Sequence, residues 1–200
     1  MKKKLLIVLV VLLLAILFFV SKGIGIYNNI VSLEENVKTA FAQIENVYQR
    51  RYDLIPNLVA TVQGEADFEK STLTEVIDAR SRLGGTIKLD ENMLNDETLM
   101  KRFQENQATL GGALGRLMMV TENYPNLKSN QSFQELRVQL EGAENRIAVE
   151  RKRYNEVVNA HNVFIRKFPN NLIAGFAGAS PKVLFSADVN ASVAPKVEFK

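Results

Sequence analysis

The hydrophobic and polar residues of this chain follow two different patterns, and the change from one to the other comes near residue 26. Residues 5–20 contain no polar side chain and follow three lysines. These sixteen residues span about 24 Å as an α-helix, and the apolar residues within 21–26 extend that length toward the ~30 Å of a hydrocarbon core. Residues 1–26 are therefore predicted to be a transmembrane anchor that contacts membrane lipid through residues 5–20.

From residue 27 onward, apolar residues recur at intervals of three and four, the spacing of amphipathic helices. Four helices are predicted: residues 26–55, Pro56 to the pair Gly84–Gly85, Asn95 or Asp96 to the Y-P-N-L sequence at 124–127, and Ser129–Phe168. Helices with one apolar face bury it against each other, and short connections make neighbours antiparallel. The predicted fold is all-α, with a transmembrane helix at 1–26 and an antiparallel up-and-down four-helix bundle at 27–168. The C-terminal tail, 169–200, is predicted to be partly disordered, with one short amphipathic turn or strand.

Residues 49–58, Q-R-R-Y-D-L-I-P-N-L, are predicted to be the corner between the first two helices. Asp53 can cap the second helix, and Pro56 is tolerated in a first helical turn. In such a bundle this corner lies at the end farthest from the membrane. The Gly84–Gly85 loop and the tail are expected beside the bilayer.

Charge and composition exclude several classes of function. Setting aside Lys2, Lys3, Lys4 and Lys22 leaves 21 of the 25 basic side chains against 22 acidic ones, so the body of the protein is close to neutral. No basic stripe with interleaved aromatic residues remains, which argues against nucleic-acid binding. The absence of Cys excludes disulfides, thiolate metal sites and a cysteine nucleophile.

The sequence offers no catalytic or metal centre. His161 is the only histidine, and no positioned nucleophile or acid accompanies it in the sequence. A carboxylate-bridged di-metal bundle needs two Glu-x-x-His motifs, yet the residue three positions before His161 is Val158. We therefore predict no catalytic residue, no metal and no cofactor.

Ionisable residues interrupt the apolar stripes, and a buried unpaired charge is costly. If Tyr27 and Phe168 are level in the first and fourth helices, Arg51 lies opposite residue 144, so Glu144 or Glu150 is its partner. Such pairs are predicted to fix helix register. The predicted structural polar core is Arg51, Glu69, Glu144, Glu150 and His161. The alternative is a recognition cleft at the distal corner, formed by Arg50, Arg51, Tyr52 and Asp53.

Three stretches resemble the LemA family: residues 40–62 with R-Y-D-L-I-P-N-L at their centre, residues 133–158, and F-P-N-N-L-I-A-G-F at 168–176. The family usually has Tyr-Asn where this chain has His161-Asn162, and its tail motif is altered in S-P-K-V-L-F-S-A at 180–187. The resemblance implies a membrane-anchored four-helix bundle whose biochemical role is not established.

These observations favour a non-enzymatic scaffold or binding module at the cell envelope, with another envelope protein or a peptide as its partner. Lys2, Lys3 and Lys4 outnumber Lys22, so the positive-inside rule places the N-terminus in the cytoplasm and the bundle outside. Two alternatives remain open. One is an enzyme accessory or small-ligand-binding protein that uses Arg50, Arg51 and Asp53. The other is a secreted bundle produced by signal cleavage, which the intact mass of the mature protein distinguishes.

Overall fold

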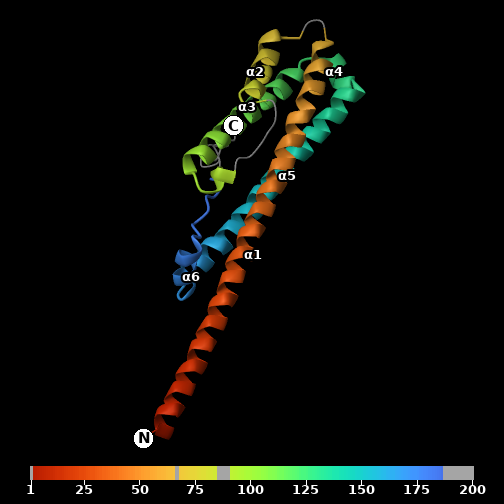
Figure 1. The fold of residues 1–200 in the computed structure, drawn as a ribbon. Coiled ribbons are helices and arrows are strands. Elements are labelled where there is room, and N and C mark those ends of the chain that lie inside the picture. The colour runs from red at the N-terminus through yellow and green to blue at the C-terminus, as the bar shows by residue number, and fades with distance from the viewer. Residues whose placement is uncertain (1, 66–67, 85–90, 187–200) are drawn as a thin grey trace, which may run out of the picture.

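The computed structural model describes residues 2–65, 68–84 and 91–186. Within these ranges the chain forms six α-helices, one 3₁₀ helix and no strand (Figure 1). They are α1 (Lys2–Gln63), α2 (Lys70–Ser81), η1 (Glu91–Leu94), α3 (Glu97–Thr121), α4 (Pro125–Ser129), α5 (Gln131–Arg166) and α6 (Asn170–Ala177). The predicted all-helical class with a long apolar N-terminal helix is confirmed.

The helix α1 is continuous from the apolar run to Gln63, so the predicted corner at 49–58 is wrong. Pro56 lies inside this helix on an exposed face. It has no amide hydrogen for a helix hydrogen bond and its ring crowds the preceding turn, which together destabilise a helix by about 3 kcal/mol. Ile55, Leu58 and Val62 are almost completely buried on the other face. Burial of each such side chain contributes about 1.5–3 kcal/mol, which outweighs the proline.

The helix α1 ends at Gln63 and α2 begins at Lys70, so the connection between them lies beyond the predicted corner. Asp53 does not cap a second helix. Its carboxylate accepts a hydrogen bond from Gln49 Nε2 at 2.6 Å, one helical turn earlier in α1. The sequence signal for continuity is the apolar spacing itself, which runs through Pro56 without a change of period.

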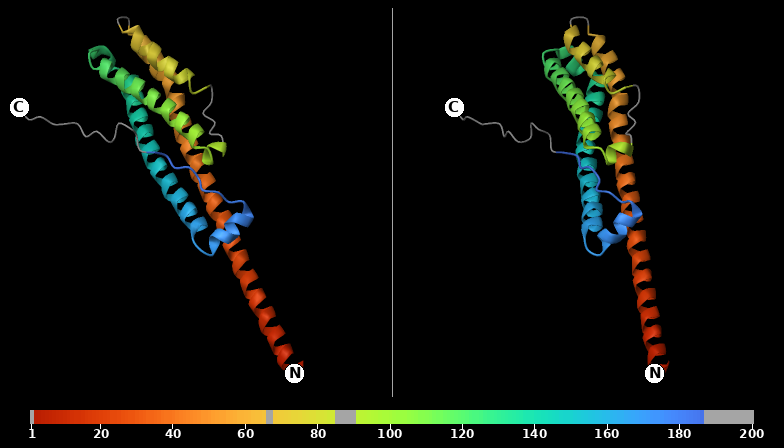
Figure 2. Two further views of the ribbon diagram at one scale, coloured as in Figure 1. Left: turned by 90° about the vertical axis from the view of Figure 1, so that its left-hand side faces the viewer. Right: turned by 60° about the vertical axis from the view of Figure 1, so that its left-hand side comes forward.

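The helices α1 and α5 run antiparallel and side by side over most of their length (Figure 2). Three contacts define the register: Glu34 Oε1 lies 3.8 Å from His161 Nε2, the rings of Phe41 and Tyr154 are 5.8 Å apart, and Arg51 pairs with Glu144. Each step along α1 is matched by an equal step back along α5. This is the register that the sequence predicts from Tyr27 and Phe168.

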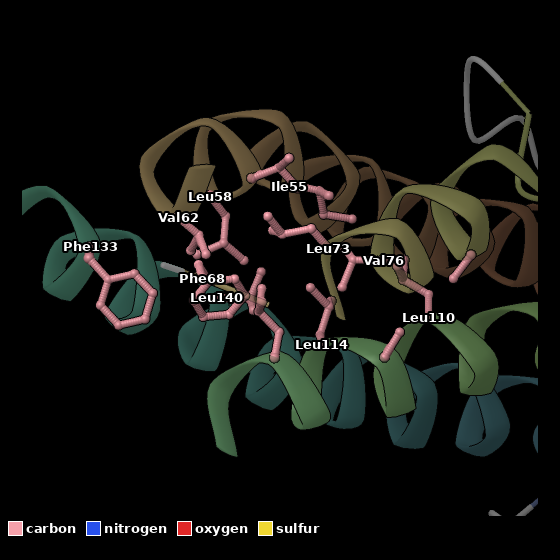
Figure 3. Packing of buried hydrophobic residues seen from close by; sticks show 14 of the residues in the cluster. Ile55, Leu58, Val62, Phe68, Leu73, Val76, Leu110, Leu114, Phe133 and Leu140 are labelled. Atoms are coloured by element: carbon pink, nitrogen blue, oxygen red, sulfur yellow. The ribbon is translucent and has the colours of Figure 1, made fainter. Parts of the chain in front are cut away.

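The helices α2 and α3 pack together and cover the distal half of the α1–α5 pair. Figure 3 shows the apolar cluster that all four helices share. Its labelled members are Ile55, Leu58, Val62, Phe68, Leu73, Val76, Leu110, Leu114, Phe133 and Leu140. The predicted four-helix bundle is not confirmed as such, because α2 has only 12 residues and α1 and α5 continue as a pair toward the N-terminus of α1.

Several predicted boundaries agree with the structure. Asp96 caps α3 by accepting from the amides of Thr98 and Leu99, and α3 ends shortly before Tyr124. The longest predicted body helix corresponds to α5. The expected position of Gly84 beside the bilayer is wrong, because its carbonyl accepts from the Tyr52 hydroxyl at 2.7 Å. Tyr52 lies about 39 Å along α1 from residue 26. Gly85 lies outside the described residues.

The first part of the C-terminal tail, residues 169–186, is ordered and contains a short helix. The helix α6 packs against α1 and α5, and residues 181–186, here called the strap, run antiparallel to α5 (Figure 2). The predicted partial disorder of the tail, 169–200, is not tested further, because residues 187–200 lie outside the described residues.

Two asparagines of α5 hold the strap, and the side chain of each binds both the backbone amide and the backbone carbonyl of one strap residue. Asn162 donates to the Lys182 carbonyl at 2.8 Å and accepts from its amide at 2.7 Å. Asn155 makes the same two bonds with Phe185, each at 2.9 Å. Seven helical residues and three extended residues both span about 10 Å, so the two pairs are in register. The strap is therefore fixed to α5 as a partner strand would be.

Substitution of Asn155 by Ala should release the distal end of the strap, because the Phe185 amide and carbonyl lose their partner. At about 1 kcal/mol per hydrogen bond, the free energy of unfolding should fall by about 2 kcal/mol. Hydrogen exchange at residues 183–186 should accelerate. Asn159→Ala is the matched control, since Asn159 is exposed on the same helix. If the hydrogen exchange of residues 183–186 is unchanged in Asn155→Ala, the proposed role of Asn155 in holding the strap is wrong.

A candidate binding cleft beside Arg51

Arg51 is the one buried guanidinium in the described chain, and three helices surround it. Its Nη1 donates to Glu144 Oε1 of α5 at 2.5 Å, and its Nη2 donates to Gln107 Oε1 of α3. The Arg51 side chain is 4% exposed, whereas that of Glu144 is 42% exposed. The arginine of this ion pair is thus buried, whereas its carboxylate is open to water. This arrangement lowers the desolvation cost of the pair.

Two hydrogen-bond donors of this cluster have no partner among the described residues. They are Arg51 Nε and the Gln107 amide nitrogen, both buried. A buried donor without an acceptor costs roughly 1–3 kcal/mol. The cluster therefore holds α1, α3 and α5 in register, and two of its donors stay unpaired inside it.

A cleft of ≈ 330 Å³ opens beside this cluster between α3 and α5. Arg51, Gln107 and Glu144 line it, together with Gly111 and Gly112 of α3. A Cβ added at either glycine would meet nothing within 4 Å, so helix packing does not require glycine there. Each glycine destabilises a helix interior by about 1 kcal/mol relative to alanine, and here the two leave part of the α3 side of the cleft without side chains.

The four residues of the predicted recognition cleft are not brought together. Successive residues of a helix point about 100° apart, so Arg50–Asp53 point in four directions around α1. Arg50 lines a different cleft with residues of α5. Tyr52 is buried beneath the guanidinium of Arg80, 4.0 Å from its ring centre, and Asp53 is exposed. Of the four, Arg51 alone lies in the cleft described here.

The other predicted polar-core residues differ in their surroundings. Glu69 is exposed at the start of α2 and accepts from the Ser71 hydroxyl at 2.7 Å, so its placement in the core is wrong. The reason is that α1 extends to Gln63, which places Glu69 in the connection before α2. Glu150 is half-buried, 3.9 Å from Arg153 on the same helix. Neither residue joins the Arg51 cluster.

His161 is completely buried, in contact with the lower part of α1 and with the strap. Its Nδ1 lies 3.2 Å from Asn162 Oδ1 and its Nε2 lies 3.8 Å from Glu34 Oε1. Lys182 of the strap approaches the same Glu34 oxygen at 3.5 Å. The histidine therefore belongs to the contact between α1, α5 and the strap.

The described residues contain no group of three or more His, Asp or Glu side chains placed to hold a metal.

Tyr154 has a structural role: its hydroxyl donates to the Val183 carbonyl at 2.8 Å, and burial raises the pKa of the phenol. It stays protonated at neutral pH. What the Arg51 cleft offers chemically is therefore a set of hydrogen-bond donors for a carbonyl or carboxylate.

Several residues of these sites cannot be found in the sequence by spacing. Gln107 lies on α3, and its approach to Arg51 depends on how α3 crosses the α1–α5 pair. Asn155 and Asn162 are separated by seven residues, a spacing that places two polar side chains on one helix face. That spacing is the one signal in the sequence for a segment bound along α5.

Comparison with known proteins places the chain in a family. A family model described as LemA family matches residues 40–199. The chain belongs to the LemA family. Its relatives include magnetosome protein MamQ 2 of Paramagnetospirillum magneticum, 30% identical over 179 residues, and MamQ of Magnetospirillum gryphiswaldense, 28% identical over 179 residues. Both alignments cover 82% of this chain and 66% of the relative, so the chain spans about two thirds of their length.

A second kind of relative carries the family name itself. Protein LemA of Metamycoplasma hominis is 24% identical over 167 residues, which cover 80% of this chain and 71% of the relative. None of these names denotes an enzyme or a reaction. Family membership thus supports a helical protein whose biochemical role is not established.

In this LemA protein, substitution of Arg51 by Ala should lower the free energy of unfolding by about 2 kcal/mol. The side-chain oxygen of Gln107 would stay buried without its donor, whereas Glu144 regains water. Arg50→Ala is the matched control and should change stability by less than about 0.5 kcal/mol, because Arg50 is exposed. Chemical denaturation followed by circular dichroism measures both. An Arg51→Ala protein as stable as Arg50→Ala would overturn the structural role.

Proposed function

We propose that this LemA protein is a non-enzymatic, single-span membrane protein that binds a segment of another envelope protein in the cleft beside Arg51. The observation that carries the proposal is the pair of unpaired donors on Arg51 and Gln107, buried beside a cleft to which Gly111 and Gly112 contribute no side chain. An exposed peptide segment supplies carbonyl oxygens for those donors. Gly111 and Gly112 let the backbone of that segment approach α3 closely.

The membrane part of the proposal rests on α1. By length and composition it is the one helix in the described ranges that can cross a membrane, and residues 5–20 are exposed along the whole run. Because the same helix continues to Gln63, a bound partner would be held at a fixed distance from the bilayer. We regard the helical body as a four-helix bundle with a short second helix. It lies at the end of α1 that is farther from the proposed span.

The proposed orientation places the N-terminus in the cytoplasm and the body outside. Lys2, Lys3 and Lys4 precede the span and Lys22 follows it. The positive-inside rule counts the side chains that flank a span in the sequence, and these favour a cytoplasmic N-terminus.

The relatives support a binding role over a single reaction. Proteins named for the magnetosome and a mycoplasma protein named LemA align with most of this chain. A helical module that occurs in proteins with such different names suits a general scaffold whose partners differ. We propose an envelope protein as the partner in this case.

A small ligand that carries a carbonyl or carboxylate is the second candidate. The volume of the cleft favours it, since ≈ 330 Å³ lies at the lower end of the roughly 300–1,000 Å³ of small-molecule sites. Such a ligand would use the same donors. It would give no protein adduct in the experiment below.

A photo-crosslinking side chain at Ala108, which lines the cleft, should form an adduct with an envelope protein in intact membranes. Gly112→Leu should abolish the adduct by filling the cleft. It should not weaken the fold, because leucine favours helix over glycine by nearly 1 kcal/mol. Gly142→Leu is the matched control, since Gly142 lines the separate cleft beside Arg50. An adduct that survives Gly112→Leu would contradict the proposed site.

A further inference from the structure

The short helix α6 lies against α1 at the end of its apolar run. Ile173 of α6 reaches to 3.7 Å from the point where a Cβ of Gly23 would lie, and Ala174 joins a buried cluster with Ile30. Counting about 20 residues for a ~30 Å hydrocarbon core from Leu5 places its boundary near Ile24. The helix α6 therefore lies at the level of that boundary.

The helix α6 has two apolar faces, and α1 and α5 cover one of them. Ile173 and Ala174 form the covered face. Leu172 and Phe176 are one turn apart on the opposite face and are 55% and 92% exposed. Phe168, just before the helix, is 81% exposed. In the described body beyond the span, these side chains form a bare apolar group at the boundary level.

Basic residues flank the segments that carry this apolar group. Arg166 and Lys167 are exposed at the end of α5, and Lys22 is exposed on α1. Between Glu156 and Asp188 the sequence contains no acidic residue. Apolar side chains beside a cluster of cations, without acidic residues, are typical of segments that lie at the surface of anionic membranes.

We propose that Phe168, Leu172 and Phe176 insert into the interface of the bilayer that α1 spans. The inference rests on the proposed membrane span and adds to it a second point of attachment. The occupant of the exposed face is lipid, because α6 packs beside Gly23, at the end of the exposed apolar run of α1 that includes Phe19 and Ile24.

A second attachment changes what the anchor can do. A single span leaves the body free to rotate about α1 and to tilt. Insertion of α6 on one side of α1 fixes both motions, since α6 also contacts the end of α5. The cleft beside Arg51 is then presented to one side of the molecule at a constant height.

Tryptophan fluorescence tests the inference directly, because the chain has no Trp. Three full-length proteins are reconstituted in vesicles of phosphatidylcholine and phosphatidylglycerol: Phe19→Trp in the span, Phe176→Trp in α6, and Met119→Trp on the exposed distal surface. Lipids brominated near the headgroup end or near the bilayer centre act as quenchers. All three positions are exposed, so tryptophan is tolerated at each.

We expect Phe176→Trp to show blue-shifted emission and quenching mainly by the shallow bromines, Phe19→Trp to be quenched by the deep ones, and Met119→Trp by neither. Quenching at Phe19→Trp with none at Phe176→Trp would overturn the α6 inference and leave the span intact. Blue-shifted emission at Phe176→Trp without quenching would also overturn it, since another protein surface would then cover α6. No quenching at Phe19→Trp would instead refute the proposed span.

Discussion

The contact between the apolar stripe of α1 and that of α5 holds the rest of the molecule in place. The pairs Glu34–His161, Phe41–Tyr154 and Arg51–Glu144 all keep one antiparallel register, with equal steps along both helices. A slip by one residue would turn every buried side chain of one helix away from the other. Because α1 is also the proposed membrane anchor, this register would set the height of every other element above the bilayer.

The elements added to this pair complete it at different levels. At the distal half, α2 and α3 cover the stripe and bring Gln107 to Arg51. In the middle, the strap is bound by Asn155 and Asn162 and closes the core over Tyr154. At the end of the pair nearest the apolar run of α1, α6 covers Ile30. Each addition leaves a distinct surface, and the proposed cleft and the proposed interfacial contact arise from the first and the last.

Much of this fold can be predicted from the sequence, because heptad-like spacing specifies both the helices and their pairing. The Arg51–Glu144 register follows from chain lengths alone. The sequence predicts a corner at Pro56 because a proline near Asp53 satisfies the local rules for a helix start. Burial of Ile55 and Leu58 overrides those rules, and this depends on tertiary contacts. A second helix that begins at Pro56 would place Glu69 on its apolar stripe. In the structure Glu69 instead lies just before α2 and is exposed.

The strap and the Gln107 contact could not be predicted, for a different reason. Residues 181–186 have no helical or strand period, and their order comes from the side chains of Asn155 and Asn162. The position of Gln107 follows from the crossing of α3 over α1, which spacing does not encode. Long-range polar contacts of this kind depend on the completed packing.

The distance between Asn28 and Gln63 tests the continuous α1 most directly. Both residues are exposed on α1, and the chain has no cysteine to interfere with spin-labelling of the Asn28→Cys, Gln63→Cys protein. In lipid nanodiscs, a straight helix of 35 steps predicts a separation of about 52 Å by double electron–electron resonance. A chain that turned back at residues 53–57 would give a separation of about 30 Å, which would contradict the account.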